Sequence, residues 1–460
     1  MRIIILGAGQ VGGSLAQNLV NEDNDITLID TDEQRLFELK HRLDIQTVHG
    51  SASHPKILLQ AGIKQADMVI AVTNSDEVNM IGCFIAYNLF QTPSKIARIR
   101  SENYYEYPAI FENNAMPIDV RISPEQLVTE HIINLVDYPG TTQILDFYNG
   151  QILLMTIKIN LDDGMHGKNI QQITRLLDSL DVKIVALFRR KVSIPVTNDC
   201  ILIKNDSISF IASSEAIQPT LVVLGCYVEP NKRIIIAGGG NIGKRLAISL
   251  ERRYQVKVID HNSVSAAKLA AHLEKATVLE GDIADKDLLV NENIEFTDVF
   301  CAVTNDDEAN IMACLQAKKL GVKYTMALVN KDAYVDLIDD SSIDYAISPQ
   351  HITIGSILTK LRRGNMIKVH RLQHDEAEVI ELIINGDEQT SRVIGRKIEE
   401  IEFPPGCMLA AVARDGEVFI IDSDFVLQEK DHVIILLLKK RYIRQLESLF
   451  QVNLSFMSLN

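Results

Sequence analysis

Short apolar runs alternate with amphipathic stretches along the first part of the chain. Runs of strand length occupy residues 3–6, 25–29, 68–72 and 95–99. Between them, residues 32–41 and 77–89 carry apolar side chains at helical spacing. Because strands that alternate with helices are joined by crossover connections, this order predicts a parallel, doubly wound sheet.

The same order returns in the second half, with predicted strands at residues 234–237, 255–259, 298–303 and 324–328. Gly7-Ala-Gly9-Gln-Val-Gly12 has its counterpart in Gly238-Gly-Gly240-Asn-Ile-Gly243, 231 residues later. At the same offset, Val72-Thr-Asn-Ser-Asp-Glu-Val-Asn79 recurs as Val303-Thr-Asn-Asp-Asp-Glu-Ala-Asn310. The chain is therefore predicted to use one folding unit twice.

Each predicted sheet is followed by a helix that begins with serine and proline. Ser123-Pro-Glu-Gln126 matches a capping box, and Ser348-Pro-Gln-His351 begins the corresponding helix. Such a helix is predicted to link the sheet to a neighbouring domain or subunit, because one face is apolar in both copies: Val128, Ile132, Leu135 and Val136 in the first, and Ile354, Ile357, Leu358 and Leu361 in the second.

Two smaller segments, residues 140–228 and 366–455, are predicted to be α+β modules. In the second we expect a helix at 395–401, a turn at 403–406, and strands at 409–414, 417–421 and 433–438. Asp415-Gly416 between two of these strands is a strong hairpin signal. The first has weaker signals, with strands at 183–188 and 208–212 and a hairpin turn at Arg189-Arg-Lys191. The polar residues 229–232 are the expected central linker.

The predicted fold class is α/β, with two Rossmann-like doubly wound parallel-sheet domains, each followed by a small α+β domain. The expected boundaries are residues 1–138, 139–228, 229–364 and 365–460. A chain of 460 residues agrees with this number, since a domain usually takes about 100–200 residues.

Composition and charge restrict the kinds of partner that the chain can bind and where it is located. A net charge of −15 disfavours nucleic acid, which is bound through neutralisation of phosphates by Lys and Arg. The longest apolar runs, such as Val433-Ile-Ile-Leu-Leu-Leu438, are far shorter than the ~18–20 residues of a membrane span. A strand begins at residue 3, so we expect no signal peptide and a cytoplasmic protein. The six cysteines lack the spacing of zinc ligands and are expected to be reduced structural thiols.

The duplicated glycine pattern predicts a nucleotide cradle in each half. After a strand, the first glycine permits a tight turn, the second lets the backbone approach a pyrophosphate, and the third allows close packing of the helix. N–H groups at the start of the helix then face the anion. The alternative is that the glycines only connect strand to helix.

An acid follows the second predicted strand of each half, Asp30 in the first and Asp260 in the second. A carboxylate there accepts hydrogen bonds from ribose hydroxyls and repels a 2′-phosphate, which favours NAD(H) or ADP-type ligands over NADP(H). The alternative is a cap for the next helix, a role that Thr31 or Asp32 could also fill.

Thr73-Asn74 and Thr304-Asn305 follow the next buried strand of each half, where sheets of this type bind ligands. The asparagines could alternatively cap the following helix. Arg98, at the end of the last predicted strand of the first sheet, could reach a phosphate. Leu328 stands opposite it in the second half, so the second pocket lacks this cation.

Motifs of common enzymes are missing from the sequence. It contains no G-x-S-x-G, H-E-x-x-H or Walker A pattern, and its histidines are dispersed. A dehydrogenase needs a general acid or base over the nicotinamide. We therefore predict a nucleotide sensor and not an enzyme. The alternatives are an NAD-dependent oxidoreductase with duplicated Rossmann domains and a scaffold whose cradles no longer bind.

The repeated order of cradle, acid, Thr-Asn pair, Ser-Pro helix and α+β module resembles the cytoplasmic domains that regulate potassium conductance, of RCK or KTN type. The tandem form is similar to the regulatory proteins of Trk-type potassium uptake systems. The stretches of this sequence that carry the resemblance most clearly are residues 302–311, 333–337, 347–350 and 390–395.

This resemblance implies a non-enzymatic regulatory subunit, peripheral on the cytoplasmic face of the inner membrane. It would assemble as a homotetramer, dock on a Trk-type potassium-translocating membrane subunit, and bind NAD(H), or ATP and ADP. By match of position, the implied ligand contacts are Gly7, Ala8, Gly9, Gln10, Val11, Gly12, Asp30, Thr73, Asn74 and Arg98, and in the second half Gly238, Gly239, Gly240, Asn241, Ile242, Gly243, Asp260 and Thr304.

The two halves depart from the family pattern in different ways. Family members commonly carry Gly-Asp directly after strand three of the family's sheet. The second half keeps this pair as Gly281-Asp282, and the first half replaces it with Gly50-Ser51. Together with the missing second arginine, this predicts that the two pockets differ in affinity or in ligand.

Overall fold

The computed structural model describes residues 1–20, 24–112, 115–160, 164–190, 192–339, 342–361, 366–372 and 377–452. Its contacts divide the chain into two compact units. One comprises residues 1–131 and 233–357, and the other residues 132–232 and 358–460. Each unit therefore combines corresponding segments from the two halves of the chain. The three predicted boundaries between the four domains stay a prediction, and the boundary at 364/365 lies outside the described residues.

The first half opens with a six-stranded parallel sheet in the order β3-β2-β1-β4-β5-β6. Four of its strands are the predicted apolar runs, within one or two residues. The sequence missed β3 and β6, which are short and partly exposed. The strands are β1 Arg2–Leu6, β2 Asp25–Asp30, β3 Gln46–His49, β4 Met68–Ala71, β5 Ser94–Arg98 and β6 Val120–Ile122.

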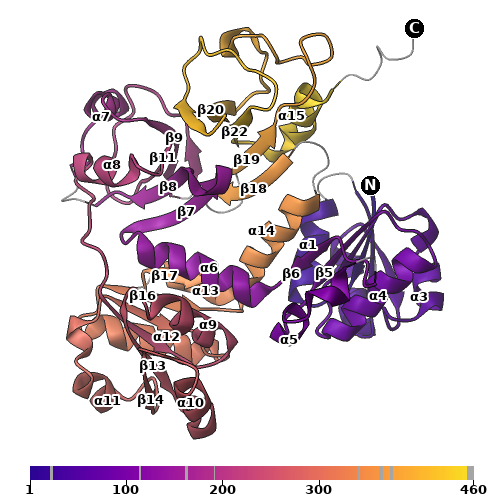
Figure 1. The fold of residues 1–460 in the computed structure, drawn as a ribbon, viewed down its shortest axis with the longest axis horizontal. Helices are drawn as coiled ribbons and strands as arrows, with labels where there is room; N and C mark the ends of the chain where they lie inside the picture. The colour runs from indigo at the N-terminus through magenta and orange to yellow at the C-terminus, as the bar shows by residue number, and fades with distance from the viewer. Residues whose placement is uncertain are drawn as a thin grey trace. The chain divides into compact units, whose positions relative to one another are not determined.

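Helices cover both faces of this sheet (Figure 1). They are α1 Gln10–Val20, α2 Glu33–Arg42, α3 Pro55–Gln60 and α4 Asp76–Asn88. The short helix α5 Glu102–Tyr105 follows β5, and α6 Pro124–Asp137 follows β6. Short polar side chains begin two of them, because a cap must accept the free N–H groups of the first turn. Asp32 accepts from Arg35 N at the start of α2, and Ser75 accepts from Val78 N at the start of α4.

The second half repeats this sheet in the order β14-β13-β12-β15-β16-β17. Its strands are β12 Arg233–Ala237, β13 Gln255–Asp260, β14 Thr277–Glu280, β15 Val299–Ala302, β16 Tyr324–Leu328 and β17 Tyr345–Ile347. Its helices are α9 Asn241–Leu250, α10 Ser263–Ala270, α11 Lys286–Asn291, α12 Asp307–Lys319, α13 Asp332–Asp339 and α14 Pro349–Leu361. The prediction of two Rossmann-like doubly wound sheets is confirmed.

Each half continues into a five-stranded antiparallel sheet, in the orders β10-β9-β11-β8-β7 and β18-β19-β22-β20-β21. The first consists of β7 Thr141–Phe147, β8 Ile152–Lys158, β9 Val182–Arg189, β10 Val192–Ile194 and β11 Ser207–Ser213. The second consists of β18 Met366–Leu372, β19 Ala377–Ile383, β20 Cys407–Arg414, β21 Glu417–Ile420 and β22 His432–Leu437.

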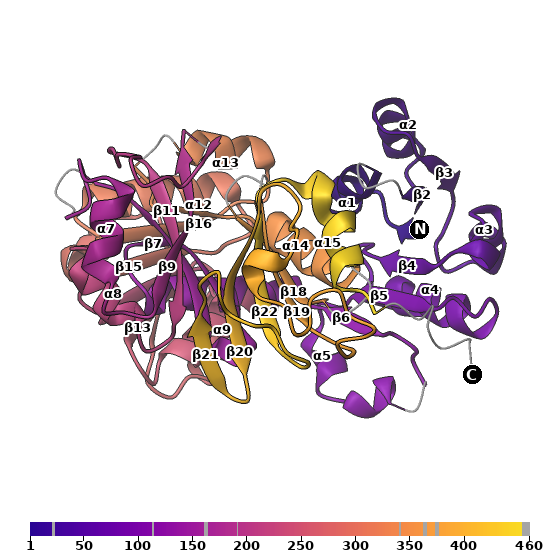
Figure 2. The ribbon, with the colours of Figure 1, turned by 90° about the horizontal axis from the view of Figure 1, so that it is seen from above.

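The predicted hairpin at Asp415-Gly416 is confirmed and joins β20 to β21 (Figure 2). Both turn residues have positive φ, 53° and 90°, as the favoured two-residue turn requires. The first copy turns at Arg190, with φ 51°, while Lys191 lies outside the described residues.

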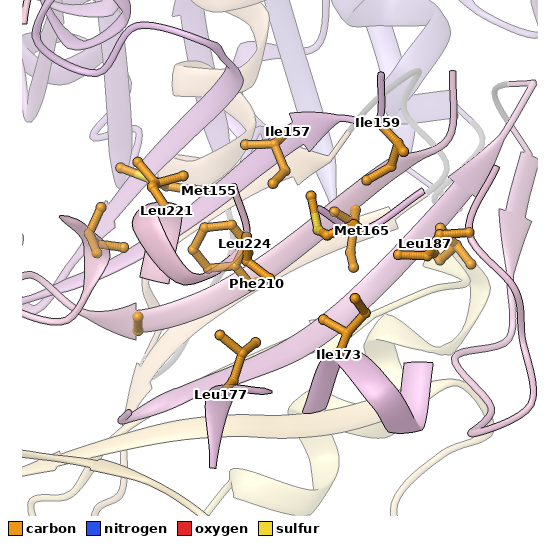
Figure 3. Packing of buried hydrophobic residues seen from close by; sticks show 14 of the residues in the cluster. Met155, Ile157, Ile159, Met165, Ile173, Leu177, Leu187, Phe210, Leu221 and Leu224 are labelled. Atoms are coloured by element: carbon orange, nitrogen blue, oxygen red, sulfur yellow. The ribbon is translucent and has the colours of Figure 1, made fainter. Parts of the chain in front are cut away.

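Helices α7 Ile170–Leu177 and α8 Ile217–Val223 cover the first small sheet, and α15 Ile443–Phe450 belongs to the second. Ile173 and Leu177 of α7 share one buried cluster with Phe210 and Leu187 of the sheet (Figure 3). These contacts make the first small segment the α+β module that was predicted. Among the described residues, no helix is long and apolar enough to span a membrane.

Two local predictions were wrong. Residues 395–401 form only a 3₁₀ turn, Ile398–Glu400, because Gly395 has φ 77° and interrupts any helix that would include it. The capping box at α6 is only half present. Ser123 Oγ accepts from Gln126 N at 3.4 Å, but the Gln126 side chain donates to Glu130 Oε1.

The apolar stripes of α6 and α14 are buried as predicted. All four named residues of α6 are at most 2% exposed, and Ile354, Ile357 and Leu358 of α14 are at most 4% exposed. The side chain of Leu361 lies outside the described set.

The two small sheets share one hydrophobic core. A single buried cluster takes Phe147, Leu154 and Val185 from the first sheet and Leu372, Val379 and Leu436 from the second. In addition, Lys183 Nζ of the first module donates to the Ile421 carbonyl of the second at 2.8 Å. The second compact unit is therefore one packed body built from both copies.

A buried acid holds the hairpin of each small sheet. Asp431 is fully buried and accepts from Arg414 Nε at 2.7 Å and from Arg414 Nη2 at 2.8 Å. It also accepts from Gln428 N. Asp206 repeats this arrangement with Arg189 in the first copy.

Replacing Asp431 by asparagine should destabilise the second small sheet by about 2–3 kcal/mol, because the Arg414 charge loses its buried partner. Hydrogen exchange of the β20 and β22 amides measures this local opening. The same change at Glu274, whose ion pair with Arg252 is exposed, should leave exchange unchanged in its own sheet. Wild-type exchange in β22 of the Asp431→Asn protein would contradict the assigned role.

Candidate nucleotide-binding sites

The first cradle is a sharp turn between β1 and α1. Gly7 has φ 105°, and its N–H donates to the Ile29 carbonyl of β2 at 2.8 Å. A Cβ on Gly12 would lie 1.9 Å from the Gly7 carbonyl oxygen, so no other residue fits there. A Cβ on Gly9 would have no atom within 4 Å, which leaves open space beside the backbone.

The second cradle has the same geometry. Gly238 has φ 112° and its N–H donates to the Ile259 carbonyl at 2.8 Å. A Cβ on Gly243 would lie 1.8 Å from the Gly238 carbonyl oxygen, while Gly240 is open. Asn241 and Ile242 begin α9, as Gln10 and Val11 begin α1.

A pocket of about 530 Å³ opens beside the first cradle. It brings together Gly7, Gly9, Gln10, Val11, Asp30, Thr73, Asn74 and Arg98, which are eight of the predicted contacts. Ala8 and Gly12 do not line it, since Ala8 is buried and Gly12 packs against the turn. Arg35 also lines the pocket, and the sequence analysis missed it. In the second half, Ser265 occupies the position equivalent to that of Arg35.

The two acids organise the cradle loops. Asp30 Oδ2 accepts from Ala8 N and Oδ1 accepts from Asp32 N at 2.8 Å. Asp260 accepts in the same way from Gly239 N at 2.7 Å and Asn262 N at 2.8 Å. The helix caps that follow are Asp32 and Asn262, so the acids themselves do not cap.

A buried asparagine clamps the Thr-Asn loop of each half. Asn79 is fully buried and its Oδ1 accepts from Thr73 N at 2.9 Å and from Thr73 Oγ1 at 2.7 Å. Its Nδ2 donates to the Arg98 carbonyl at 2.9 Å. Asn310 makes the same bonds to Thr304 and to the Leu328 carbonyl. The signal was present in the sequence, because these asparagines end the repeated octapeptide.

The alternative role proposed for Asn74 and Asn305 is wrong. The caps of α4 and α12 are Ser75 and Asp306, each of which accepts from the third N–H of its helix. Asn74 instead lines the pocket.

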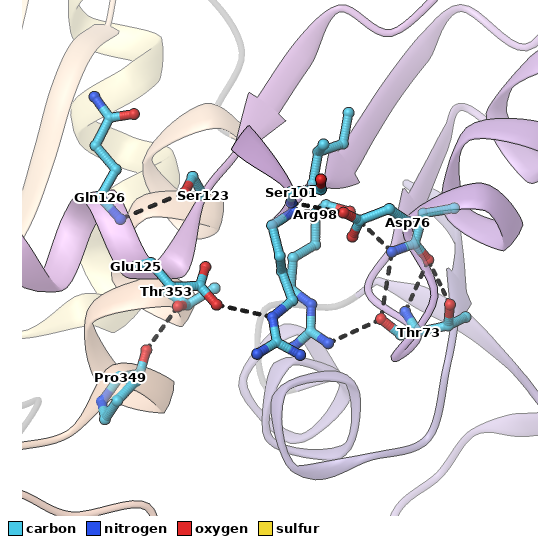
Figure 4. Close-up of polar contacts among 12 residues, drawn as sticks. Thr73, Asp76, Arg98, Ser101, Ser123, Glu125, Gln126, Pro349 and Thr353 are labelled. Atoms are coloured by element: carbon cyan, nitrogen blue, oxygen red, sulfur yellow. Dashed lines mark hydrogen bonds and ion pairs between the residues drawn. The ribbon is translucent and has the colours of Figure 1, made fainter. Parts of the chain in front are cut away.

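Arg98 places an incompletely paired cation in the first pocket. Its Nη2 donates to the Thr73 carbonyl at 2.9 Å (Figure 4), while its buried Nε has no hydrogen-bond partner among the described residues. Burial, and then repulsion by Arg100, lower the pKa of the guanidinium. An anion bound in the pocket would stabilise the charged guanidinium against both effects.

The second half has no cation at this position. Asn310 donates to the carbonyl of Leu328 as Asn79 does to that of Arg98, so the two residues are equivalent in space. The loops after the third strand also differ. Asp282 Oδ1 accepts from Ala284 N, whereas Ser51 Oγ contacts Ser53 Oγ.

Both halves match known protein families. The TrkA-N domain matches residues 3–124 and 234–349, and the TrkA-C domain matches residues 388–451. The chain is 47% identical over 456 residues to the Trk system potassium uptake protein TrkA of Halomonas elongata, covering 99% of this chain and 100% of the relative. The chain belongs to the TrkA family.

Other TrkA relatives extend over similar lengths. The TrkA of Vibrio alginolyticus is 44% identical, with 98% of this chain and 99% of the relative covered, and that of Haemophilus influenzae is 41% identical, with 99% and 100% covered. The crystal structure of the GsuK RCK domain has a TM-score of 0.61 at 17% identity, covering 98% of this chain and 94% of the other. The RCK-type fold that the sequence resemblance implied is confirmed.

Replacing Gly12 by alanine should destabilise the first sheet domain by at least about 2 kcal/mol, because the methyl group meets the Gly7 carbonyl. Gly9→Ala is the matched control, and its effect should stay within about 0.5 kcal/mol. Thermal unfolding of both proteins makes the comparison. Equal melting temperatures would show that the close approach does not hold the turn.

Proposed function

We propose that the chain is a non-enzymatic regulatory subunit of a Trk-type potassium uptake system, which binds NAD(H) or adenine nucleotides in its cradles. It acts on a potassium-translocating membrane subunit from the cytoplasmic face, as a homotetramer. The observation that carries this proposal is the pocket that joins the first cradle to Asp30 and the incompletely paired Arg98.

The residues of this pocket fit a dinucleotide or adenine nucleotide. N–H groups at the start of α1 would face a bound anion, and the open space beside Gly9 would admit a pyrophosphate. Arg98 offers a buried donor to a phosphate. Asp30 would accept from ribose hydroxyls and disfavour a 2′-phosphate. In support, one solved structure with this fold is the GsuK channel bound to NAD.

Nucleotide binding regulates transport by shifting a conformational equilibrium. A ligand that binds one geometry of the subunit better than another raises the population of that geometry. The membrane subunit responds to the geometry, so the nucleotide controls potassium flux without being consumed.

A duplicated NAD-dependent oxidoreductase is the less favoured function. Hydride transfer needs a proton donor or acceptor at the nicotinamide, usually His, Lys or Tyr. Among the described residues that line the first pocket, the titratable ones are Asp30, Asp32, Arg35 and Arg98. This composition favours binding over redox chemistry.

Potassium flux into vesicles that hold this chain and its Trk membrane subunit tests the proposal. Adding NADH, NAD⁺, ATP or ADP should change the flux, and Gly9→Ala together with Gly240→Ala should abolish the response by filling both cradles. Stoichiometric turnover of NADH with a small substrate would favour the oxidoreductase. Absence of both nucleotide binding and a flux response would favour a scaffold.

Arg98→Leu gives the first pocket the residue of the second. Loss of a charge-assisted hydrogen bond, worth about 1.5–3 kcal/mol, should weaken binding at the first cradle about 10- to 150-fold. Calorimetry of the Gly240→Ala protein isolates this cradle. Arg42→Leu, an exposed substitution outside the pocket, is the control and should leave affinity unchanged. Two identical sites in the unmodified chain would contradict the proposed inequality.

A further inference from the structure

Polar contacts from two places join the Rossmann-like halves within the described part of the first compact unit. Gln350 Nε2 of α14 donates to Ser14 Oγ of α1 at 2.7 Å. Glu102 of α5 forms ion pairs with two cations of α9, with Oε1 2.9 Å from Arg245 Nε and Oε2 3.6 Å from Lys244 Nζ. Since α1 and α9 begin at the cradles, each cradle helix contacts a side chain of the other half.

The internal repeat relates only the cradle-helix residues of these contacts, and the partners that they meet come from different elements. Arg245 occupies in α9 the position of Ser14 in α1, and Gln350 occupies in α14 the position of Glu125 in α6. The contact to α1 is therefore between a hydroxyl and an amide, whereas α9 carries the charges. Glu125 pairs with Arg100 through Oε1, and its buried Oε2 has no hydrogen-bond partner among the described residues.

A short segment, fixed by hydrogen bonds to Asp76, connects Glu102 to the first pocket. Arg98, which lines the pocket, precedes it by four residues. Between them, Asp76 Oδ2 accepts from the N–H of Arg100 at 2.9 Å and from that of Ser101 at 2.8 Å (Figure 4). A bound anion that moves Arg98 therefore acts on the chain that carries Glu102.

We propose that the contact of Glu102 with Lys244 and Arg245 couples the two cradles, so that a nucleotide in the first changes the affinity of the second. The inference rests on the proposed function, because both cradles must bind. The coupling is reciprocal by thermodynamic linkage. Glu102 is 37% exposed, so added salt weakens the coupling.

Calorimetric titration of the full chain with NADH, and separately with ATP, measures the coupling. Gly9→Ala leaves only the second cradle and Gly240→Ala leaves only the first. The overall binding constant of the unblocked chain, divided by the product of the two single-site constants, is the coupling factor. We expect a factor of about five or more in either direction, and a value of about one after Glu102→Gln is added to all three proteins.

Three further proteins control the measurement. Glu274→Gln removes an acid from an exposed ion pair of the second half and should keep the factor. Arg245→Lys preserves the charge and should retain most of it. The charge-swapped Glu102→Arg, Arg245→Glu protein should restore part of it. If Glu102→Gln fails to fold, Arg245→Gln removes the same ion pair from the other side and should also bring the factor to about one.

The outcomes separate this inference from the proposed function. A factor of one in the unblocked chain, or a factor that Glu102→Gln leaves unchanged, overturns the coupling while both cradles still bind. If neither nucleotide binds to any of the proteins, the proposed function itself fails.

Discussion

The close approach of each cradle helix to its turn is the constraint on which the rest of the structure depends. The Gly7 carbonyl lies where residue 12 would carry a side chain, and Gly238 and Gly243 repeat this. The contact fixes the start of the helix at the end of a buried strand, so its N–H groups face the pocket. Asp30 accepts a hydrogen bond from Ala8 N in the loop between that strand and the helix.

Hydrophobic pattern predicted the strands that are buried on both faces, such as β1 and β4, because they must be apolar throughout. It failed for β3, whose residues are half exposed, since few apolar side chains mark such a strand. β8 is an apolar run that periodicity cannot distinguish from part of a helix. Only its antiparallel partners, β7 and β11, determine its structure.

Sequence predicted the residues of the candidate site whose role follows from their spacing along the chain. The glycines and Asp30 belong to a spacing that the chemistry of the cradle requires. Asn79 escaped interpretation because its task depends on tertiary structure, as it joins Thr73 to the carbonyl of Arg98, 19 residues away in sequence. Arg35 is likewise recognised only once α2 is placed beside the cradle.

The shared core of the two small sheets has a consequence for how this chain can evolve. Cutting the chain at the central linker would expose Phe147 and Val379, so neither half is a finished protein. A dimer of identical single copies could bury the same surface, but every mutation would then appear in both pockets. Joining the copies in one polypeptide removes that restriction, which is how Arg98 and Leu328 can occupy equivalent positions in the same molecule.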